Sequence, residues 1–321
     1  MSTSFEMIES DDSILISVLM PTYNVEKFVG EAVESILAQS WQNFELIIVD
    51  DCSTDRTYDI LKTYLEKDSR IRLYRNEKNS KICKTLNTAL ENAKGSYIVR
   101  MDGDDISTKD RFAKLYQYLQ THPKIDIVGS NVITIDERGK KLSHKRFISS
   151  DKGIKVGNRY MPCVLHIWMA RRQVYDKLGG YRDIPYAEDF DFLLRGELIG
   201  LRYANVQEYL YYVRIRNGNT GSSNGLVQRK TADYVKRLHK IEKETGKDQF
   251  DVAKYNRAIY CTDQEKERYA LAATLLEKAI RNKNNPALVF FYVMRAAFTS
   301  WFEFKYLLEA IAIRIVAICI R

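Results

Sequence analysis

Three of the four residues at positions 102–105 are aspartates, and they directly follow an apolar stretch, residues 97–101. Carboxylates packed so closely repel one another unless a cation lies among them. Oxygen ligands suit a hard divalent ion, and Mg²⁺ or Mn²⁺ usually keeps coordination positions open for substrate phosphates. Asp102, Asp104 and Asp105 are therefore candidate metal ligands, with an exposed acidic turn as the alternative.

Two further acidic pairs lie near apolar segments. Asp51 ends the stretch 44–51, and we expect that strand to lie next to the one carrying residues 102–105, which makes Asp51 a candidate ligand for a base or ribose. Glu188 and Asp189 open a predicted helix, residues 188–198, and either supply a general base or are first-turn acids favoured by the helix dipole. If both face one pocket, Glu188 should raise the pKa of Asp189 by like-charge repulsion.

His166 is the one histidine that lies in an apolar stretch, residues 164–169, which we interpret as a strand. It is a candidate site residue, although a core histidine with satisfied hydrogen bonds fits the same pattern.

The elements that would position these residues are strands alternating with helices. This order predicts a mainly parallel sheet with right-handed crossovers, and ligands of such sheets bind beyond the carboxyl ends of the strands. The turn after the first strand has neither GxGxxG nor GxxxxGK[ST], so side chains and a metal would have to hold any nucleotide diphosphate. The periodicity predicts strands at 14–20, 44–49, 71–74, 97–101 and 125–135, and helices at 28–37, 57–65, 84–93 and 172–178.

Four segments taken in order resemble the motifs of family 2 inverting glycosyltransferases of GT-A fold, of the bacterial surface-polysaccharide type. They are residues 17–24, 49–55, 102–105 and 188–191, and the resemblance spans residues 14–216. It implies a mixed, mainly parallel nucleotide-diphospho-sugar transferase sheet flanked by helices. The Q/RxxRW pattern of processive synthases is absent near residue 214, so transfer of one sugar is expected rather than polymerisation.

The resemblance also implies roles for single residues. Pro21 and Tyr23 would flank the nucleoside, and Asp51 would bind a uracil-like base. Asp102 would face the ribose or the metal, Asp104 or Asp105 would bind Mn²⁺ or Mg²⁺, and Asp189 would be the base. His166, Arg214 and Arg216 fall where acceptor-side or diphosphate-contacting groups are expected. The implied enzyme is a hexosyl- or N-acetylhexosaminyltransferase that moves a sugar from a nucleotide sugar, as a UDP-sugar, to a hydroxyl of a saccharide or lipid-linked acceptor.

The charge of the chain is concentrated in its C-terminal third. Of the formal net charge of +8, residues 226–321 carry +7, with 18 Lys and Arg against 11 Asp and Glu. No nucleic-acid-binding motif accompanies this charge, so we expect no nucleic-acid partner. We expect a flexible tail at 1–13, a catalytic domain at 14–216, a Gly/Ser/Asn linker at 217–225 and a basic helical region at 226–321.

Residues 287–320 are very apolar, and their charged residues fall on one half of a helical wheel. Such an amphipathic segment either packs on the catalytic domain or lies on anionic lipid, which its basic surroundings would favour. The longest charge-free run is too short to span a bilayer. Five scattered cysteines and the lack of a signal peptide predict a cytoplasmic protein, peripheral on the inner membrane face if the lipid alternative holds.

Two other functions fit part of the pattern. A nucleotidyltransferase has a similar sheet and acidic metal site, but its Gly-rich basic loop is missing after the first strand. A sugar- or lipid-binding scaffold without activity would not require the complete set of acids.

Overall fold

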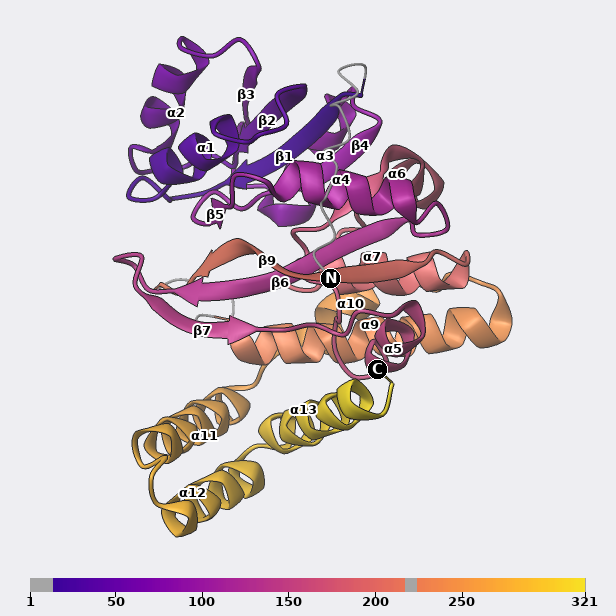
Figure 1. Cartoon of the computed structure of the whole chain (residues 1–321). Coiled ribbons are helices and arrows are strands. Elements are labelled where there is room, and N and C mark those ends of the chain that lie inside the picture. The colour runs from indigo at the N-terminus through magenta and orange to yellow at the C-terminus, as the bar shows by residue number, and fades with distance from the viewer. Residues whose placement is uncertain (1–13, 217–223, 321) are drawn as a thin grey trace, which may run out of the picture.

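The computed structural model describes residues 14–216 and 224–320 (Figure 1). The predicted tail at 1–13 and most of the predicted linker, residues 217–223, lie outside this range. Strands are β1 (Ile16–Thr22), β2 (Phe44–Asp50), β3 (Ile71–Arg75), β4 (Tyr97–Arg100), β5 (Ile106–Ser107), β6 (Ile127–Ile135), β7 (Lys141–Lys145), β8 (Met169–Arg171) and β9 (Tyr203–Arg214). Helices of the first part are α1 (Val29–Leu37), α2 (Thr57–Leu65), α3 (Lys81–Glu91), α4 (Arg111–Thr121), α5 (Asp151–Gly157), α6 (Arg172–Leu178) and α7 (Glu188–Leu198). The second part holds α9 (Gly225–Thr245), α10 (Val252–Ile259), α11 (Asp263–Arg281), α12 (Pro286–Thr299) and α13 (Trp301–Cys319).

The described strands form one mixed sheet in the order β3-β2-β1-β4-β8-β6-β9-β5, with β7 paired to β6. The four strands β3, β2, β1 and β4 run parallel, as does the pair β6 and β9. Strand β8 is antiparallel to both of its neighbours, β4 and β6. The predicted mixed sheet flanked by helices is therefore confirmed.

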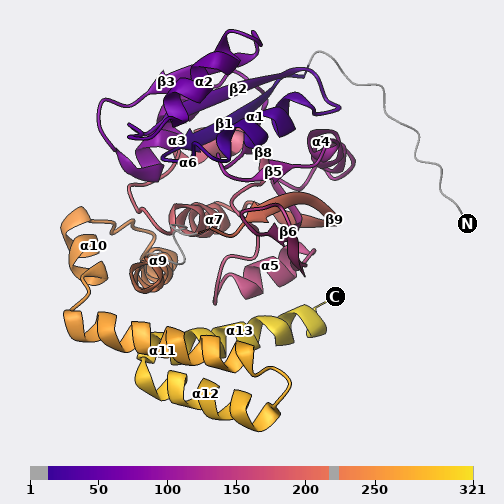
Figure 2. The same cartoon turned by 90° about the vertical axis from the view of Figure 1, so that its left-hand side faces the viewer.

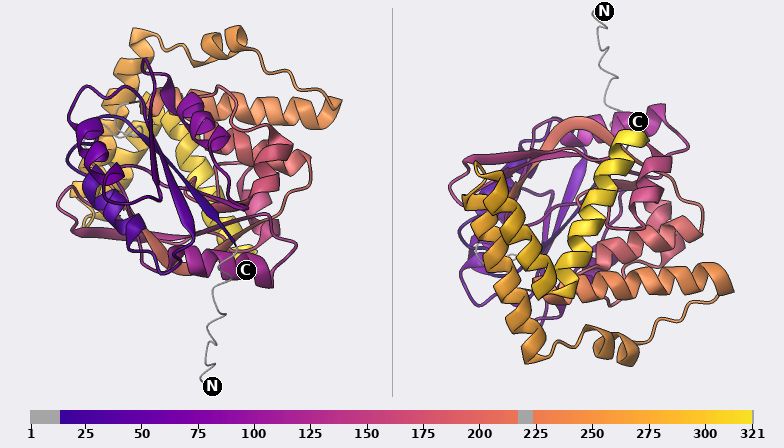
Figure 3. Two further views of the ribbon diagram at one scale, coloured as in Figure 1. Left: turned by 90° about the horizontal axis from the view of Figure 1, so that it is seen from above. Right: turned by 90° about the horizontal axis from the view of Figure 1, so that it is seen from below.

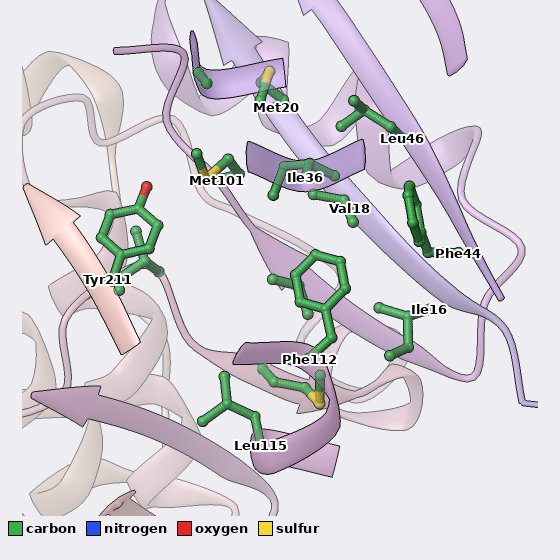
Figure 4. Packing of buried hydrophobic residues seen from close by; sticks show 14 of the residues in the cluster. Ile16, Val18, Met20, Ile36, Phe44, Leu46, Met101, Phe112, Leu115 and Tyr211 are labelled. Carbon is green, nitrogen blue, oxygen red and sulfur yellow. The ribbon is translucent and has the colours of Figure 1, made fainter. Parts of the chain in front are cut away.

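Both faces of the central strands are buried, which explains why they are almost continuously apolar. Along β1, Val18 and Met20 point to the face covered by α1, α2 and α4, whereas Leu19 points to the face covered by α3, α6 and α7. Figure 4 shows the first of these two layers, with Phe112 of α4 packed near Ile16 and Val18. The two layers fix the strands, and with them the loops at their carboxyl ends.

Two sequence predictions about strands are wrong. Residues 164–168 form bends and turns rather than a strand, and β8 begins only at Met169, where pairing with β4 and β6 starts. Strand β2, which ends at Asp50, is not the neighbour of β4, because β1 lies between them. Asp51 and the acidic turn are therefore one strand further apart than expected.

Helices α11, α12 and α13 lie at the end of the molecule away from β3 and α2, and α9 and α10 lie between them and the sheet (Figures 1 and 2). Seen from below, α13 crosses the base of the molecule, with its last turns beside α5 (Figure 3). The Asn285 side chain caps α12, and Pro286 follows at its first position. The predicted single amphipathic segment is broken at Ser300 into α12 and α13.

Helix α13 is buried on two sides. Three of its four charged residues face α9, where Glu303 pairs with Arg229 at 2.8 Å, Lys305 with Asp233 at 2.6 Å and Glu309 with Lys236 at 2.5 Å. Near its end, Val316 packs into the core of the catalytic region. Large apolar side chains point outward on α12 and α13, namely Leu288, Phe290, Phe291, Phe298, Trp301, Leu308, Ile311, Ile315 and Ile318. No helix in the described part of the chain is long and apolar enough to cross a membrane.

Candidate active site

The acidic turn at residues 102–105 follows β4 and lies against the end of β1. A side chain at Gly103 would place its Cβ 2.8 Å from Cγ2 of Thr22, so glycine is what lets the turn approach β1. Asp105 is buried, and Asp102 and Asp104 are partly exposed. The carboxylates therefore gather at the carboxyl edge of the sheet, as the sequence predicts.

Arg214 and Arg216 reach this turn because β5 pairs antiparallel with β9 and draws the end of β9 alongside. The backbone N–H of Arg214 donates to Asp105 at 2.7 Å, and Nε of Arg216 lies 2.6 Å from Oδ2 of Asp104. Both guanidinium groups lie over the ring of Phe28, at 4.8 and 5.9 Å from its centroid. The structure thus brings the two predicted arginines together with the predicted metal ligands.

His166 joins the acidic turn to the predicted base. Because β8 runs antiparallel to β4, the residues that precede β8 lie beside those that follow β4. Nε2 of His166 is 2.8 Å from Oδ2 of Asp102, and Nδ1 is 3.6 Å from Oδ2 of Asp189. The imidazole therefore bridges two carboxylates that come from a strand end and a helix start.

Arg100 is a second buried cation in the same cluster, and sequence reasoning missed it. Its guanidinium donates to Glu188 at 2.9 Å and to Asp102 at 3.2 Å, and its side chain is only 5% exposed. The available signal was an arginine inside the apolar stretch 97–101, directly before the aspartates. Glu188 thus lies in an ion pair with Arg100, while Asp189, its neighbour, contacts His166.

These contacts set the protonation of the cluster. Burial and the charge of Arg100 lower the pKa of His166, but the charge and hydrogen bond of Asp102, with the hydrogen bond of Asp189, outweigh them and raise it to about 10. Burial works to raise the pKa of Asp189, yet the hydrogen bond and charge of His166 hold it below its usual value. The imidazole is consequently cationic at neutral pH and Asp189 is ionised.

The expectation that Glu188 would raise the pKa of Asp189 is therefore wrong, because the His166 cation outweighs the repulsion. It is Glu188 whose pKa is raised, by burial first and by the charge of Asp189 as well, against the opposing effect of Arg100. The pKa of Asp105 is raised well above its usual range by burial and by the charges of Asp104 and Asp102.

Asp51, the predicted base-binding residue, lies at the same edge but is engaged with its own chain. Its carboxylate accepts hydrogen bonds from Nδ2 of Asn76 at 2.7 Å and from the backbone N–H groups of Ser80 at 2.7 Å and Lys81 at 3.0 Å. It therefore holds the start of α3. Its own N–H donates to the carbonyl of Thr22 at 2.8 Å, which places it beside the predicted nucleoside-flanking pair, buried Pro21 and Tyr23, which is 44% exposed.

Backbone strain collects around this edge of the sheet. Four non-glycine residues in the described ranges have positive φ, and they follow β1, β2 and β3 or precede α7. They are Asn24, Cys52, Lys81 and Tyr186. Non-glycine residues hold this conformation only where the surrounding structure imposes it, which is common at functional sites.

Within residues 14–216 and 224–320, no group of three or more His, Cys, Asp or Glu side chains is placed to chelate a metal ion. The chemistry of the turn nevertheless fits a cation, because the burial of Asp105 beside two other carboxylates raises its pKa. Mg²⁺ is typically held by one or two carboxylates, with substrate phosphates and water completing its shell. Asp104 and Asp105 meet that smaller requirement.

The chain is similar to known proteins. Residues 17–179 match the family described as "Glycosyl transferase family 2". The "Putative glycosyltransferase EpsE" of Bacillus subtilis (strain 168) is 38% identical over 203 residues, which cover 62% of this chain and 72% of that protein.

Two solved structures share the fold at low sequence identity. S. aureus TarS 1–349 in complex with UDP-GlcNAc has a TM-score of 0.58 and 18% identity, covering 95% of this chain and 90% of that one. The mannosyltransferase PcManGT from Pyrobaculum calidifontis, in complex with GDP-Man and Mn²⁺, has a TM-score of 0.58 and 15% identity, covering 92% and 86%. With its strand-end acids and its matched motifs, the chain belongs to glycosyl transferase family 2, whose members transfer a sugar from a nucleotide-sugar donor.

Proposed function

We propose that this family 2 glycosyltransferase is inverting and metal-dependent, and that it moves one sugar from a UDP-sugar to a hydroxyl of a saccharide or lipid-linked acceptor. Asp189 is the proposed base. The observation that carries the proposal is the bridge of His166 between Asp189 and Asp102, which couples the base to the acidic turn. Family membership favours glycosyl transfer over the nucleotidyltransferase alternative.

The bridge explains how Asp189 would act. An acceptor hydroxyl must lose its proton as it attacks, and a carboxylate can take that proton only while it is ionised. The cationic His166 keeps Asp189 ionised at neutral pH. Glu188 supports the site differently, because its ion pair with Arg100 fixes the first turn of α7, on which Asp189 lies.

Asp104 and Asp105 are the proposed metal ligands, with Asp102 directed toward the ribose or the same ion. A bound Mn²⁺ or Mg²⁺ would act as a Lewis acid on the departing diphosphate. Arg214 and Arg216 are the proposed diphosphate contacts, and both lie over Phe28 beside the turn. Arg214 is buried and its guanidinium donates to Glu31 and to the carbonyl of Asp104, so the structure favours Arg216 of the two.

The proposed nucleoside site lies between Tyr23 and Asp51. The Asp51 carboxylate already accepts three hydrogen bonds, and an ionised carboxylate has about four lone-pair sites. A base would therefore use the remaining one. UDP as the nucleotide and a hexosyl or N-acetylhexosaminyl group as the sugar are supported by the likeness to TarS, which binds UDP-GlcNAc.

Calorimetry and product analysis test this proposal. UDP should bind in the presence of Mn²⁺ and lose most of its affinity in EDTA, and Asp104→Ala should abolish that dependence on the metal. UDP-sugar hydrolysis without an acceptor would distinguish an enzyme from an inactive scaffold. An unchanged affinity in EDTA contradicts the metal role, and retention of the donor's anomeric configuration contradicts single displacement.

We also propose that the C-terminal helices rest on an anionic membrane surface. The outward apolar side chains of α12 and α13 and the net charge of +7 over residues 226–321 support it, because peripheral helices combine both features. A lipid-linked acceptor would then be presented close to the catalytic region.

A further inference from the structure

A cavity of about 370 Å³ opens between α7 and the C-terminal helices. One end of it is formed by Asp189 and Phe190, at the start of α7. The remaining wall comes from α9, α11 and α13 and from the segment 160–162 that follows α5. The cavity therefore connects the proposed base to the C-terminal helices, and apart from the segment 160–162 its lining lies outside the family match at residues 17–179.

The wall has the composition expected of a sugar site. Aromatic rings line it from four elements or loops, and the apolar faces of a pyranose ring pack well against such rings. The aromatic residues are Tyr160, Tyr186, Tyr269, Phe302 and Tyr306. The volume of about 370 Å³ lies near the lower end of the range typical for small-molecule sites.

Polar groups are placed among these rings. Arg229 is fixed on three sides: Glu303 accepts from it at 2.8 Å, its Nε lies 3.2 Å from the hydroxyl of Tyr269, and its guanidinium lies 3.7 Å from the centroid of the Tyr306 ring. The side-chain amide of Gln228, one residue earlier, has no hydrogen-bond partner among the described residues, although it lines the same cavity. An amide offers two donors and an acceptor, which matches the hydroxyl groups of a sugar.

The backbone is shaped to admit these residues. A Cβ at Gly225 would collide with the hydroxyl of Tyr269, so glycine at the start of α9 allows that ring to enter the wall. Tyr186 adopts φ of 78°, which is strained for a non-glycine residue. It lies three residues before Asp189, and both residues line the cavity. The strained turn therefore forms the cavity wall next to the proposed base.

We propose that this cavity is the acceptor subsite and holds the terminal sugar of the acceptor. This inference rests on the proposed function, since Asp189 is its base. In the step it implies, the acceptor hydroxyl gives its proton to the Asp189 carboxylate while its oxygen forms a bond to the anomeric carbon of the donor. The bond from that carbon to the phosphate oxygen breaks, and the nucleoside diphosphate leaves with the electron pair.

A larger cavity serves as the control. It measures about 1770 Å³, adjoins the first cavity, with which it shares Tyr160, Asp233, Phe302, Lys305 and Glu309, and extends past basic side chains such as Lys240 and Lys243. None of the predicted site residues within the described ranges lines it. Lys240 is exposed and belongs to the same helix as Gln228, so Lys240→Ala is a matched substitution outside the proposed subsite.

The test is titration by calorimetry with methyl glycosides of glucose, galactose, N-acetylglucosamine and rhamnose, in the presence of UDP and Mn²⁺. At least one should bind the wild-type protein, and its affinity should fall at least tenfold in Gln228→Ala, which removes the free amide. Ala232→Phe, which fills the cavity, should abolish the binding. Lys240→Ala should bind the glycoside as the wild type does, and all three variants should keep the wild-type affinity for UDP.

The outcomes separate the two proposals. If no glycoside binds the wild type, or if its affinity is unchanged in both cavity variants, the acceptor subsite is wrong while UDP binding leaves the enzyme proposal intact. If n-decyl phosphate binds the wild type instead and no longer binds Ala232→Phe, the cavity holds an alkyl chain and the inference is equally wrong. Failure of UDP to bind the wild-type protein with Mn²⁺ would instead contradict the proposed function.

Discussion

The catalytic region and the C-terminal helices place their charged and apolar side chains in opposite ways. In residues 14–216 the apolar side chains fill two layers around the sheet, and charged groups gather at one edge. In α13 three charged residues, Glu303, Lys305 and Glu309, face α9, while large apolar side chains such as Ile311, Ile315 and Ile318 are exposed. Ordinary burial explains the first arrangement. The second leaves apolar surface that a partner or a membrane would have to cover.

The comparison predicts that charges at the catalytic edge serve chemistry. Asp189→Asn keeps the shape and hydrogen bonding of the side chain but cannot accept a hydroxyl proton at neutral pH. Transfer should fall by about 10²–10⁴-fold, the usual effect of losing a positioned base. The loss should appear equally in kcat and in kcat/KM, with the affinity for UDP and the metal little changed.

Glu188→Gln is the control for this substitution, because it changes the adjacent carboxylate that pairs with Arg100 rather than His166. It should cost less transfer activity than Asp189→Asn. Near wild-type rates of transfer in Asp189→Asn, or an inactive but folded Glu188→Gln enzyme, would show that Asp189 is not the base.

The outward apolar faces are tested by a pair of substitutions on α12 and α13. Phe298 is 82% exposed and Ile318 is 71% exposed, so Phe298→Ser and Ile318→Ser should not disturb the packed core. Each loses about 1.5 kcal/mol of apolar burial if it enters lipid, so the double variant should bind vesicles about 100-fold more weakly. Co-sedimentation with phosphatidylglycerol vesicles measures this.

Leu142→Ser is the matched control, since Leu142 is 54% exposed on β7, in the catalytic region. Its vesicle binding should equal that of the wild type. If the double variant on α12 and α13 binds vesicles as the wild type does, the membrane proposal fails and another partner must cover these helices.

Inward charges on α13 should serve stability rather than chemistry. Glu303 is 2% exposed, and Glu303→Gln removes the charge that compensates Arg229. Removing one partner of a buried pair is strongly destabilising, but Arg229 retains some contact with water, so we expect a loss of about 2–3 kcal/mol in the free energy of unfolding. Urea unfolding measures this, and the affinity for UDP should not change.

Lys114→Ala supplies the comparison, because the Lys114–Glu208 pair is exposed and should contribute less than about 1 kcal/mol. Equal losses in the two variants would show that burial of the α13 pair does not matter. A loss of UDP affinity in folded Glu303→Gln would show that this ion pair of α13 affects donor binding as well as stability.

The bridge at the catalytic edge makes stability depend on pH. The pKa of His166 is raised from 6.5 to about 10, so its stabilising contribution is complete below about pH 6.5 and is lost as the pH rises through about 10. The stability difference between the wild type and His166→Gln should therefore shrink over that interval in urea unfolding. A difference that is constant from pH 6 to pH 10 would contradict the cationic bridge.

The longer strands and helices could be predicted from their apolar periodicity. Their alternation along the chain predicts a layered sheet whose ligands bind at the carboxyl ends of the strands. That reasoning placed Asp102, Asp104 and Asp105 at the edge. It could not place Arg214 or His166 against them, since those contacts depend on the pairing of β5 with β9 and of β8 with β4. Short strands of two or three residues, such as β5 and β8, carry too little periodicity to be recognised.

The C-terminal helices were predictable as helices but not in their orientation. A helical wheel shows that Glu303, Lys305 and Glu309 share a face without showing which way that face points. Their direction is set by Arg229, Asp233 and Lys236 on α9, a helix whose own pattern gave no sign of this pairing.

The reversed direction of β8 has a consequence for how the enzyme acquires its activity. His166 and Asp102 are 64 positions apart in the sequence, and Asp189 belongs to a helix later still. The antiparallel strand is what carries the histidine back to the first half of the sheet. Contacts between distant positions form late because a long loop must close before they can be made. A chain emerging from synthesis thus presents its acidic turn before the proposed base, Asp189, has been made, and we expect the His166 bridge between them to form only after β8 has joined the sheet.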